Sequence, residues 1–164
     1  MEVRDATDAD LTALVSIYNA VIATSTAVFS SAPVTLEDRR RWWRERTEAG
    51  YPVLVAANES EVLGFSTFGD FRASPGYRFT VEHTVHVRAD RRGAGIGTQL
   101  LEALFPRAAA LGKHMMIAAV DAANAPSIRF HERLGFHRAG CLREVGRKFD
   151  SWLDLVFLQR RIGA

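Results

Sequence analysis

The chain has 164 residues, of which 48% are hydrophobic and 24% charged, as is typical of one soluble globular domain. Its formal net charge of only +2 gives no reason to expect a nucleic-acid or membrane partner, and its single cysteine excludes an intramolecular disulfide or a cysteine-based zinc site. We therefore expect a single domain over residues 1–164 with no metal. Because no apolar run resembles a signal peptide or a membrane span, the expected compartment is the cytoplasm.

The N-terminal third of the chain predicts two helices after a short strand. Thr7 followed by Asp10, and Thr35 followed by Asp38, both match the pattern of a capping box at a helix start. Apolar residues recur at helical spacing after each of these starts. The expected ranges are 2–5 for the strand, 7–22 for the first helix, 23–33 for a loop and 35–50 for the second helix.

From residue 52 the hydrophobic pattern changes to that of strands. Expected strands cover 52–57, 62–71 and 79–88, with a loop over 72–78. A helix should follow over 95–111, and Pro106 is expected to kink or split it because proline cannot donate the helical hydrogen bond.

The C-terminal third predicts one more helix among strands. Its expected ranges are a strand over 115–120, a helix over 125–134 that ends at Gly135, and strands over 138–145 and 152–159. This order predicts an α/β (α+β) domain with a mixed central sheet and helices on both faces.

A glycine-rich segment, Arg91-Arg92-Gly93-Ala94-Gly95-Ile96-Gly97-Thr98, lies between a predicted strand and a predicted helix. Glycines allow close approach of the backbone, and a helix N-terminus attracts anions, so a pyrophosphate is the expected guest. A dinucleotide fingerprint would need glycine where Thr98 stands, and a Walker A loop would need a lysine. Coenzyme A remains, through the pattern Arg92-x-x-Gly95-x-Gly97, with a plain glycine-rich turn as the alternative.

Together with that loop, the segment Asn124-x-x-Ser127-x-x-x-His131-Glu132-x-x-Gly135-Phe136 resembles the GNAT superfamily of N-acetyltransferases. Within it, further segments are similar to the phosphinothricin and methionine sulfone/sulfoximine N-acetyltransferases; they lie at 17–19, 50–55, 69–72, 80–87 and 145–154. The resemblance implies the acyl-CoA N-acyltransferase fold, acetyl-CoA between two parallel strands of a splayed sheet, and a homodimer. It also implies acetyl transfer to the α-amino group of a small amino acid, such as methionine sulfone, methionine sulfoximine or phosphinothricin.

The resemblance implies a set of cofactor-binding residues along one strand, the glycine loop and the helix after it. Backbone N–H groups near Val85 and Val87 are expected to bind the pantetheine and the developing oxyanion. Asn124 is expected both to cap its helix and to touch the pantetheine. The full set is Val85, Val87, Arg88, Arg92, Gly93, Ala94, Gly95, Ile96, Gly97, Thr98, Asn124, Ser127 and His131.

Two residues are predicted to be catalytic. An α-ammonium group must lose a proton before it attacks a thioester, and Glu82 is the predicted base. On an alternating strand it shares a face with Thr84 and His86 at ~6.6 Å spacing, and the neighbouring apolar residues would raise its pKa. A surface carboxylate or an ion-pair partner is the alternative for Glu82. His131, where many relatives carry tyrosine, is predicted to donate a proton to the thiolate or to hydrogen-bond the cofactor, with simple packing as the alternative.

The acceptor's carboxylate and its sulfone or phosphinate oxygens need cations and N–H donors. Arg72 is the predicted carboxylate ligand, because arginine can bind both oxygens at once. The full predicted acceptor set is Phe29, Arg72, Ser74, Pro75, Gly76, Thr84, Val85, His86, Lys148 and Phe149. The chain reads Lys148-Phe149-Asp150-Ser151-Trp152 where relatives often read Lys-Phe-Gly-Arg-Trp, so one basic contact is missing.

Three other interpretations stay open. A protein or peptide N-acetyltransferase on the same fold would need an open groove, against which the bulky Phe29, Phe71 and Phe149 argue. A non-catalytic acyl-CoA-binding module is less compatible with Glu82 and a complete glycine loop. The basic and aromatic run over 39–44 is compatible with nucleic-acid binding, but the interspersed acidic residues favour an amphipathic helix.

Overall fold

The computed structural model describes residues 1–163 as one mixed sheet with helices on both faces. Its strands are β1 (Glu2–Asp5), β2 (Val53–Ala57), β3 (Val62–Asp70), β4 (Thr80–Val87), β5 (Met115–Asp121), β6 (His137–Lys148) and β7 (Ser151–Arg161). Their spatial order is β1-β2-β3-β4-β5-β7-β6. Within the described residues the only parallel neighbours are β4 and β5.

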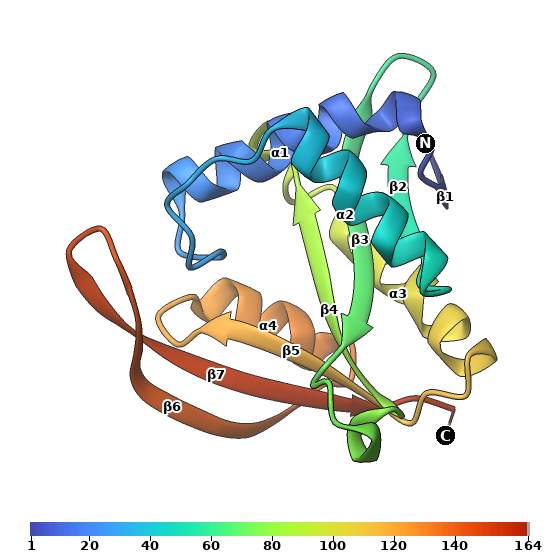
Figure 1. Ribbon diagram of the computed structural model, residues 1–164. Helices are drawn as coiled ribbons and strands as arrows, with labels where there is room; N and C mark the ends of the chain where they lie inside the picture. Colours follow the sequence, from blue (N-terminus) through green and yellow to red (C-terminus); the bar gives the residue numbers. More distant parts are fainter. Residues whose placement is uncertain (164) are drawn as a thin grey trace.

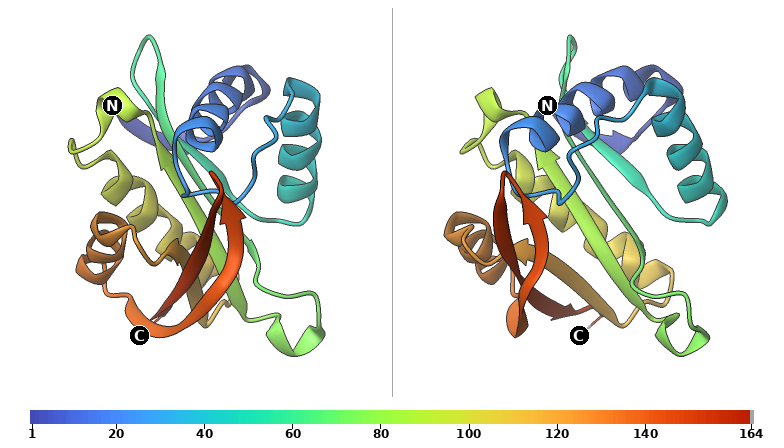
Figure 2. Two further views of the ribbon diagram at one scale, coloured as in Figure 1. Left: turned by 90° about the vertical axis from the view of Figure 1, so that its left-hand side faces the viewer. Right: turned by 60° about the vertical axis from the view of Figure 1, so that its left-hand side comes forward.

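Four α-helices of residues 1–163 cover the sheet in two layers (Figures 1 and 2). They are α1 (Leu11–Thr24), α2 (Leu36–Glu48), α3 (Ile96–Ala110) and α4 (Ala125–Arg133). Helices α1 and α2 pack on one face over Val55 and Phe65, whereas α3 and α4 pack on the other over Phe68 and Phe136. The expected mixed sheet with helices on both faces is therefore confirmed.

The helix boundaries follow from the capping residues. The carboxylate of Asp10 accepts hydrogen bonds from the backbone N–H of Thr7 at 2.7 Å and from its hydroxyl at 2.9 Å. The hydroxyl of Thr35 accepts from the N–H of Asp38 at 3.1 Å. After α2, Gly50 adopts a φ of 79°, a left-handed conformation that ends the helix at low cost for glycine.

The structure corrects two expectations about the later elements. Helix α3 continues through Pro106 without a split, because the fully buried Leu104 and Ala108 hold it against the sheet on both sides of the proline. Strands β6 and β7 are longer than expected and meet at a two-residue turn. Phe149 and Asp150 form that turn with φ of 49° and 58°, the conformation that matches the twist of a tight hairpin.

The feature that organises the site is the divergence of β4 from β5 (Figure 1). The two strands pair only at Thr80–Met115, Val81–Met116 and Glu82–Ile117. Beyond Glu82, β4 continues to Val87 beside β3, and β5 continues beside β7. Backbone groups on the facing edges of β4 and β5 therefore lack strand partners in this part of the sheet.

Candidate active site

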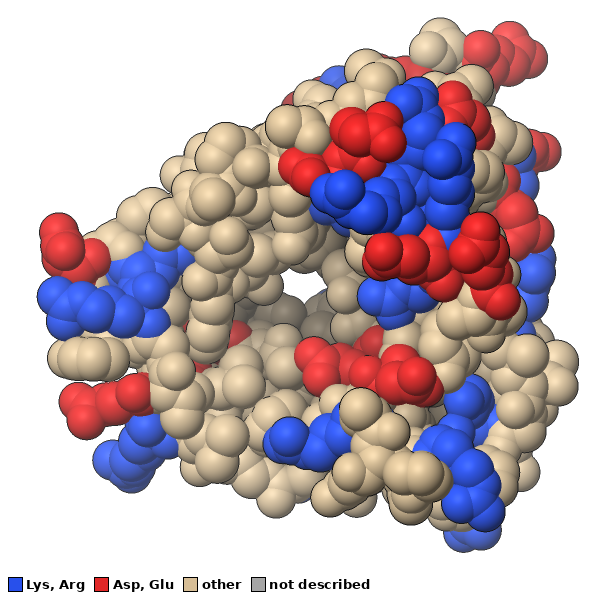
Figure 3. Space-filling view, viewed as in Figure 1, with Lys and Arg blue, Asp and Glu red and all other residues tan. Residues whose placement is uncertain are grey.

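A cleft with a volume of about 820 Å³ lies between the diverging strands β4 and β5. Residues of α1, β4, the glycine loop, β5 and α4 line it, including every residue of β4 from Glu82 to Val87. Figure 3 shows the surface hollowed near its centre below α1. Because β4 pairs with β3 in the antiparallel manner, alternate residues along its length turn their N–H and C=O groups toward this cleft.

The glycine loop closes one end of the cleft and forms an anion cradle. Gly93 and Gly95 have φ of 81° and 76°, which glycine adopts without strain. A Cβ at Gly97 would lie 3.5 Å from the Phe130 ring, an ordinary van der Waals contact, so the start of α3 packs directly beside α4. The N–H groups of Ile96, Gly97 and Thr98 begin α3 and have no partner within the helix, so they are free to bind an anion.

Glu82 lies in the cleft at the point where β4 and β5 separate. Its side chain is half-buried, and this burial raises the pKa of its carboxyl group above the ordinary value. The positive charge of Arg72 opposes part of the rise. A carboxylate with a raised pKa at this point is suited to accept a proton near neutral pH.

His131 also lines the cleft, but its chemistry differs from the expected acid. Its Nδ1 lies 2.7 Å from the carbonyl oxygen of Ser127, so Nδ1 carries the proton and donates it. Nε2 is buried without a hydrogen-bond partner in residues 1–163. Burial lowers the pKa of His131, so the ring is neutral and Nε2 is an acceptor at neutral pH. The geometry supports a cofactor contact and gives no support to proton donation.

A second buried histidine supports the neutral state of His131. The ring of His83 lies 5.1 Å from that of His131, centroid to centroid, and burial lowers the pKa of His83 far below its ordinary value. Neither nitrogen of His83 has a hydrogen-bond partner in the described residues. Two adjacent imidazoles without a nearby carboxylate cannot both carry charge in a dry environment.

His86 lines the cleft and packs against aromatic rings. Its ring lies 5.7 Å from Tyr18 and 5.5 Å from Phe65, and only 9% of the residue is exposed. Burial, helped by the charge of Arg39, lowers the pKa of His86 to about 4. His86 therefore meets the cleft as a neutral side chain.

Asn124 performs the capping role expected of it. Its side-chain oxygen accepts a hydrogen bond from the N–H of Ser127 at 3.1 Å and so begins α4, and both residues line the cleft. Asp121, at the end of β5, accepts from the N–H of Ala123 at 3.0 Å and from the Thr26 hydroxyl. The segment after α1 is thereby fixed to β5.

Several predicted site residues lie outside the lining of the cleft. The ammonium group of Lys148 donates to the carbonyl oxygens of Ser25 at 2.7 Å and Val28 at 2.8 Å, so it is a tether and not a free cation. The ring of Phe29 packs where a Cβ of Gly146 would otherwise stand. The complete set outside the lining is Phe29, Arg72, Ser74, Pro75, Gly76, Arg88, Ala94, Lys148 and Phe149. Phe71 is also absent from it, so the three phenylalanines expected to close the pocket, Phe29, Phe71 and Phe149, do not line the cleft.

The sequence did not single out several residues that line the cleft. They are Tyr18, Arg91, Asp121, Phe130 and Arg133. Tyr18 belongs to the apolar stripe of α1, where nothing in the sequence separates a cleft residue from a core residue. Arg91 is the first residue of the glycine-rich segment 91–98 but was not among the predicted cofactor-binding residues, and its place in that segment was the one available signal.

Three of the four arginines in the basic run of α2 have side-chain partners within residues 1–163. Arg39 is buried between the rings of Tyr18 and Trp42, at 4.2 and 4.4 Å from their centroids. Arg40 pairs with Asp8 at 2.8 Å, and Arg41 pairs with Asp38 at 2.7 Å. In Figure 3 the basic patch at the upper right is bordered by acidic side chains. The amphipathic helix is therefore the correct interpretation of this run.

Comparisons with known proteins agree with this geometry. The sequence matches the model of the acetyltransferase (GNAT) family over residues 14–136. It is 49% identical over 158 residues to the L-methionine sulfoximine/L-methionine sulfone acetyltransferase of Pseudomonas paraeruginosa, covering 96% of this chain and 92% of the relative.

Solved structures show the same fold. A ribosomal-protein-alanine N-acetyltransferase from Brucella melitensis superposes with a TM-score of 0.97 at 41% identity, over 99% of this chain and 100% of that one. A phosphinothricin acetyltransferase from Sinorhizobium meliloti in complex with acetyl-CoA superposes with a TM-score of 0.95 at 36% identity. The superposition covers 99% of this chain and 88% of that one. No helix within residues 1–163 is long and apolar enough to cross a membrane.

Proposed function

The chain belongs to the acetyltransferase (GNAT) family, and from this premise we propose that it transfers the acetyl group of acetyl-CoA to the α-amino group of a small amino acid. Methionine sulfone, methionine sulfoximine and phosphinothricin are the proposed acceptors. The observation that carries the proposal is the opening between β4 and β5, which has an anion cradle at one end and Glu82 at the other.

The residues of the cleft fit coenzyme A in length and in chemistry. The free N–H groups at the start of α3 suit a pyrophosphate, and Arg91 and Arg92 line the same end with positive charge. Inward-facing N–H and C=O groups of β4 near Val85 and Val87 match the amides of a pantetheine chain. The unpaired Nε2 of His131 offers one further acceptor.

Bound acetyl-CoA supplies a thioester as the acyl donor, and the residues of the chain then have three tasks. Glu82 accepts the proton of the α-ammonium group, directly or through a water, and its raised pKa suits that task. N–H groups of β4 stabilise the negative charge that develops on the carbonyl oxygen. The neutral His131 accepts a hydrogen bond from the cofactor through Nε2, and the departing thiolate takes up the proton that the attacking nitrogen loses as the tetrahedral intermediate collapses.

Acceptor binding is assigned to the end of the cleft at Glu82, whose carboxyl group feels the positive charge of Arg72. Arg72 stands on the exposed loop that also carries Ser74, Pro75 and Gly76, and its guanidinium is the proposed partner of the amino acid's carboxylate. Thr84 and His86 complete the wall from β4. Lys148 and Phe29 are no longer part of the proposed site, because the first is bound to carbonyl groups and the second packs on Gly146.

A homodimer is part of the proposal because of the β6–β7 hairpin, which projects from the sheet (Figure 1). The hairpin exposes large apolar side chains at Leu142 (45%), Val145 (52%), Phe149 (58%) and Trp152 (59%). Exposed apolar patches of this kind usually mark contact surfaces. A second copy of this chain is the proposed partner.

Acetylation of a protein N-terminus is a second candidate, since the Brucella neighbour carries that description and is 41% identical. A panel assay of coenzyme A release separates the candidates. The panel contains L-methionine sulfone, L-methionine sulfoximine, phosphinothricin and a peptide with the N-terminus of a ribosomal protein. We expect turnover of the amino acids and little of the peptide. Turnover of the peptide alone would reverse the assignment, and binding of acetyl-CoA without turnover of any acceptor would indicate a non-catalytic module.

A further inference from the structure

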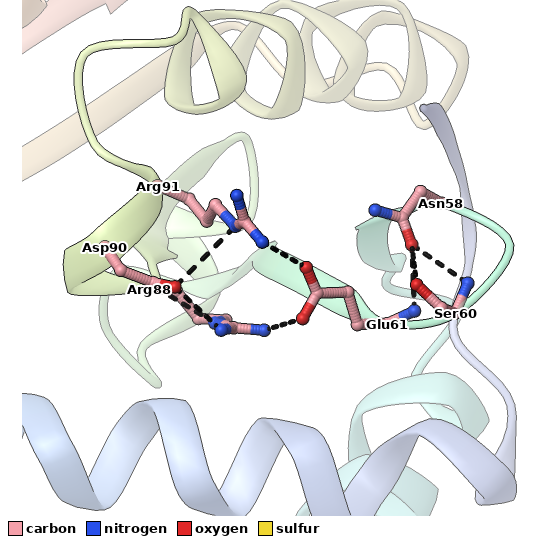
Figure 4. Close-up of polar contacts among 6 residues, drawn as sticks. All are labelled: Asn58, Ser60, Glu61, Arg88, Asp90 and Arg91. Carbon is pink, nitrogen blue, oxygen red and sulfur yellow. Dashed lines mark hydrogen bonds and ion pairs between the residues drawn. The ribbon is translucent and has the colours of Figure 1, made fainter.

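The turn that leads from β4 into the glycine loop is fixed by a cluster of four charged side chains (Figure 4). One carboxylate oxygen of Glu61 contacts Arg88, and the other accepts from Arg91 at 2.7 Å. Asp90 binds Arg88 through both oxygens, at 3.1 and 2.8 Å, and lies 3.7 Å from Arg91. Glu61 thus joins the two arginines at either end of the turn Ala89–Arg91.

The position of Glu61 is set by the turn between β2 and β3. The side-chain oxygen of Asn58 accepts hydrogen bonds from the N–H groups of Ser60 and Glu61, both at 2.9 Å. The N–H of Asn58 in turn donates to the carbonyl oxygen of Glu61 at 3.0 Å. Three hydrogen bonds thus define the conformation of the turn that carries Glu61, and its carboxylate lies against the two arginines.

Arg91 belongs to two environments at once. Its guanidinium pairs with Glu61, yet the residue also lines the cleft beside Arg92 and Gly93. The Arg91 side chain is 47% exposed, and exposed ion pairs of this kind are weak and easily exchanged. The hydrogen bond from Arg88 holds the pKa of Glu61 below its ordinary value, so the carboxylate is charged at neutral pH.

We propose that Glu61 is a positioning residue that competes with the phosphates of coenzyme A for Arg91, and so limits the affinity for the cofactor and favours release of the product. The proposal rests on the proposed function, because it assumes a polyphosphate ligand at the glycine loop. In the free protein Glu61 neutralises Arg91. In the complex a phosphate oxygen takes its place, and the repulsion between Glu61 and that phosphate opposes binding.

The test is calorimetric titration of coenzyme A into the wild type and into Glu61→Gln, which keeps the shape and removes the charge. We expect binding about two- to fivefold tighter in Glu61→Gln at low salt. The gain should shrink as sodium chloride is raised, because screening weakens exposed charge interactions. A purely structural role would weaken binding and show no such dependence on salt.

Two further variants make the test specific. Glu59→Gln removes the same charge from an exposed residue of the same turn that forms no ion pair within residues 1–163, and it should leave the affinity unchanged. Arg91→Gln should weaken binding and abolish the effect of Glu61→Gln in the double variant. Titration with dephospho-coenzyme A, which lacks the 3′-phosphate, then shows which phosphate Arg91 binds. If Glu61→Gln still binds this ligand more tightly than the wild type does, the phosphate is the pyrophosphate; if the difference disappears, it is the 3′-phosphate.

Equal or weaker binding in Glu61→Gln would overturn the role of Glu61, as would an equal gain in Glu59→Gln or a gain that persists without Arg91. A wild type that binds no coenzyme A would instead overturn the proposed function, and the role of Glu61 with it.

Discussion

Desolvation acts in opposite directions on the titratable side chains that line the cleft. It raises the pKa of Glu82 and lowers those of His83, His86 and His131, since in each case the charged form is disfavoured. At neutral pH the three histidines are therefore uncharged, and Glu82 is the one group of this set poised to exchange a proton. This assigns acid–base chemistry to β4 and hydrogen bonding to α4.

Replacement of Glu82 by Gln tests this assignment. The base acts only when deprotonated, so the rate of the wild type should rise with pH through the raised pKa of Glu82. In Glu82→Gln we expect kcat to fall by roughly 100-fold or more and this rise to disappear. Steady-state rates across the pH range are the measurement, and Glu102→Gln, an exposed carboxylate on α3, is the control. An unaltered pH profile in Glu82→Gln would remove Glu82 as the base.

The lowered pKa of the buried His86 leads us to predict that the protein loses stability in mild acid. The unfolded chain protonates this histidine near its ordinary pKa of 6.5, whereas the folded chain does so only near 4. The free energy of unfolding should therefore fall as the pH drops from 6.5 toward 4, with about 3 kcal/mol from His86 alone. His83 and His131 act in the same direction.

Denaturant unfolding at about pH 7.5 and about pH 5 checks this contribution. His86→Phe, which can keep the ring contacts with Tyr18 and Phe65, should lose less stability between the two values than the wild type. His137→Gln, at an exposed site, should behave like the wild type. Equal losses in the wild type and in His86→Phe would contradict the burial of a neutral His86.

Individual residues differ in how far the sequence predicts them. Glu82, Asn124 and the glycines lie in the cleft as expected, because local patterns on a strand, a helix start and a loop determine their placement. Lys148 and Phe29 do not, because their contacts come from segments more than 100 positions apart in the chain. No local pattern distinguishes a lysine that binds an anion from one that binds two carbonyl groups.

Among the elements, the β6–β7 hairpin and the segment after α1 depend on one another through Lys148. In Lys148→Met the carbonyl oxygens of Ser25 and Val28 lose their donor, which should lower the free energy of unfolding by about 1–3 kcal/mol. The same segment supplies Ser25, Ala27 and Val28 to the cleft, so the KM for the amino acid should rise.

Denaturant unfolding and steady-state kinetics test the role of this tether. Arg147→Met is the matched control, since the neighbouring side chain is 51% exposed and should tolerate the change. If Lys148→Met were as stable and as active as Arg147→Met, the tether would have no role.

The sequence predicts helices and inner strands better than the hairpin. Capping residues and helical periodicity are local: Thr35 predicts the start of α2 correctly, whereas Thr7 begins a 3-10 turn over Asp8–Asp10 and α1 follows only from Leu11. The length of β6 depends on pairing with β7, and its almost entirely exposed side chains show no alternation of apolar and polar residues. The continuity of α3 at Pro106 likewise depends on packing against the sheet, which the sequence alone does not display.

For the whole molecule, the exposed face of the hairpin predicts self-association. Light scattering after size-exclusion chromatography should give the mass of a dimer for the wild type. The double variant Val145→Asp, Trp152→Asp places charges on the apolar face and should give a monomer. Leu36→Asp, at an exposed leucine on α2, should leave the dimer intact. A monomeric wild type would contradict the proposed partner.

The divergence of β4 from β5 determines the site from single residues to the whole molecule. It exposes backbone groups, places Glu82 where the two strands separate and leaves the glycine loop at the far end of the cleft. The most direct test of the account is proton NMR of a mixture of the protein, acetyl-CoA and L-methionine sulfone. The account predicts a new amide proton coupled to the α-hydrogen, as acetylation of the α-amino group requires. An unmodified amino acid, under conditions where acetyl-CoA binds and an N-terminal peptide is acetylated, would contradict it.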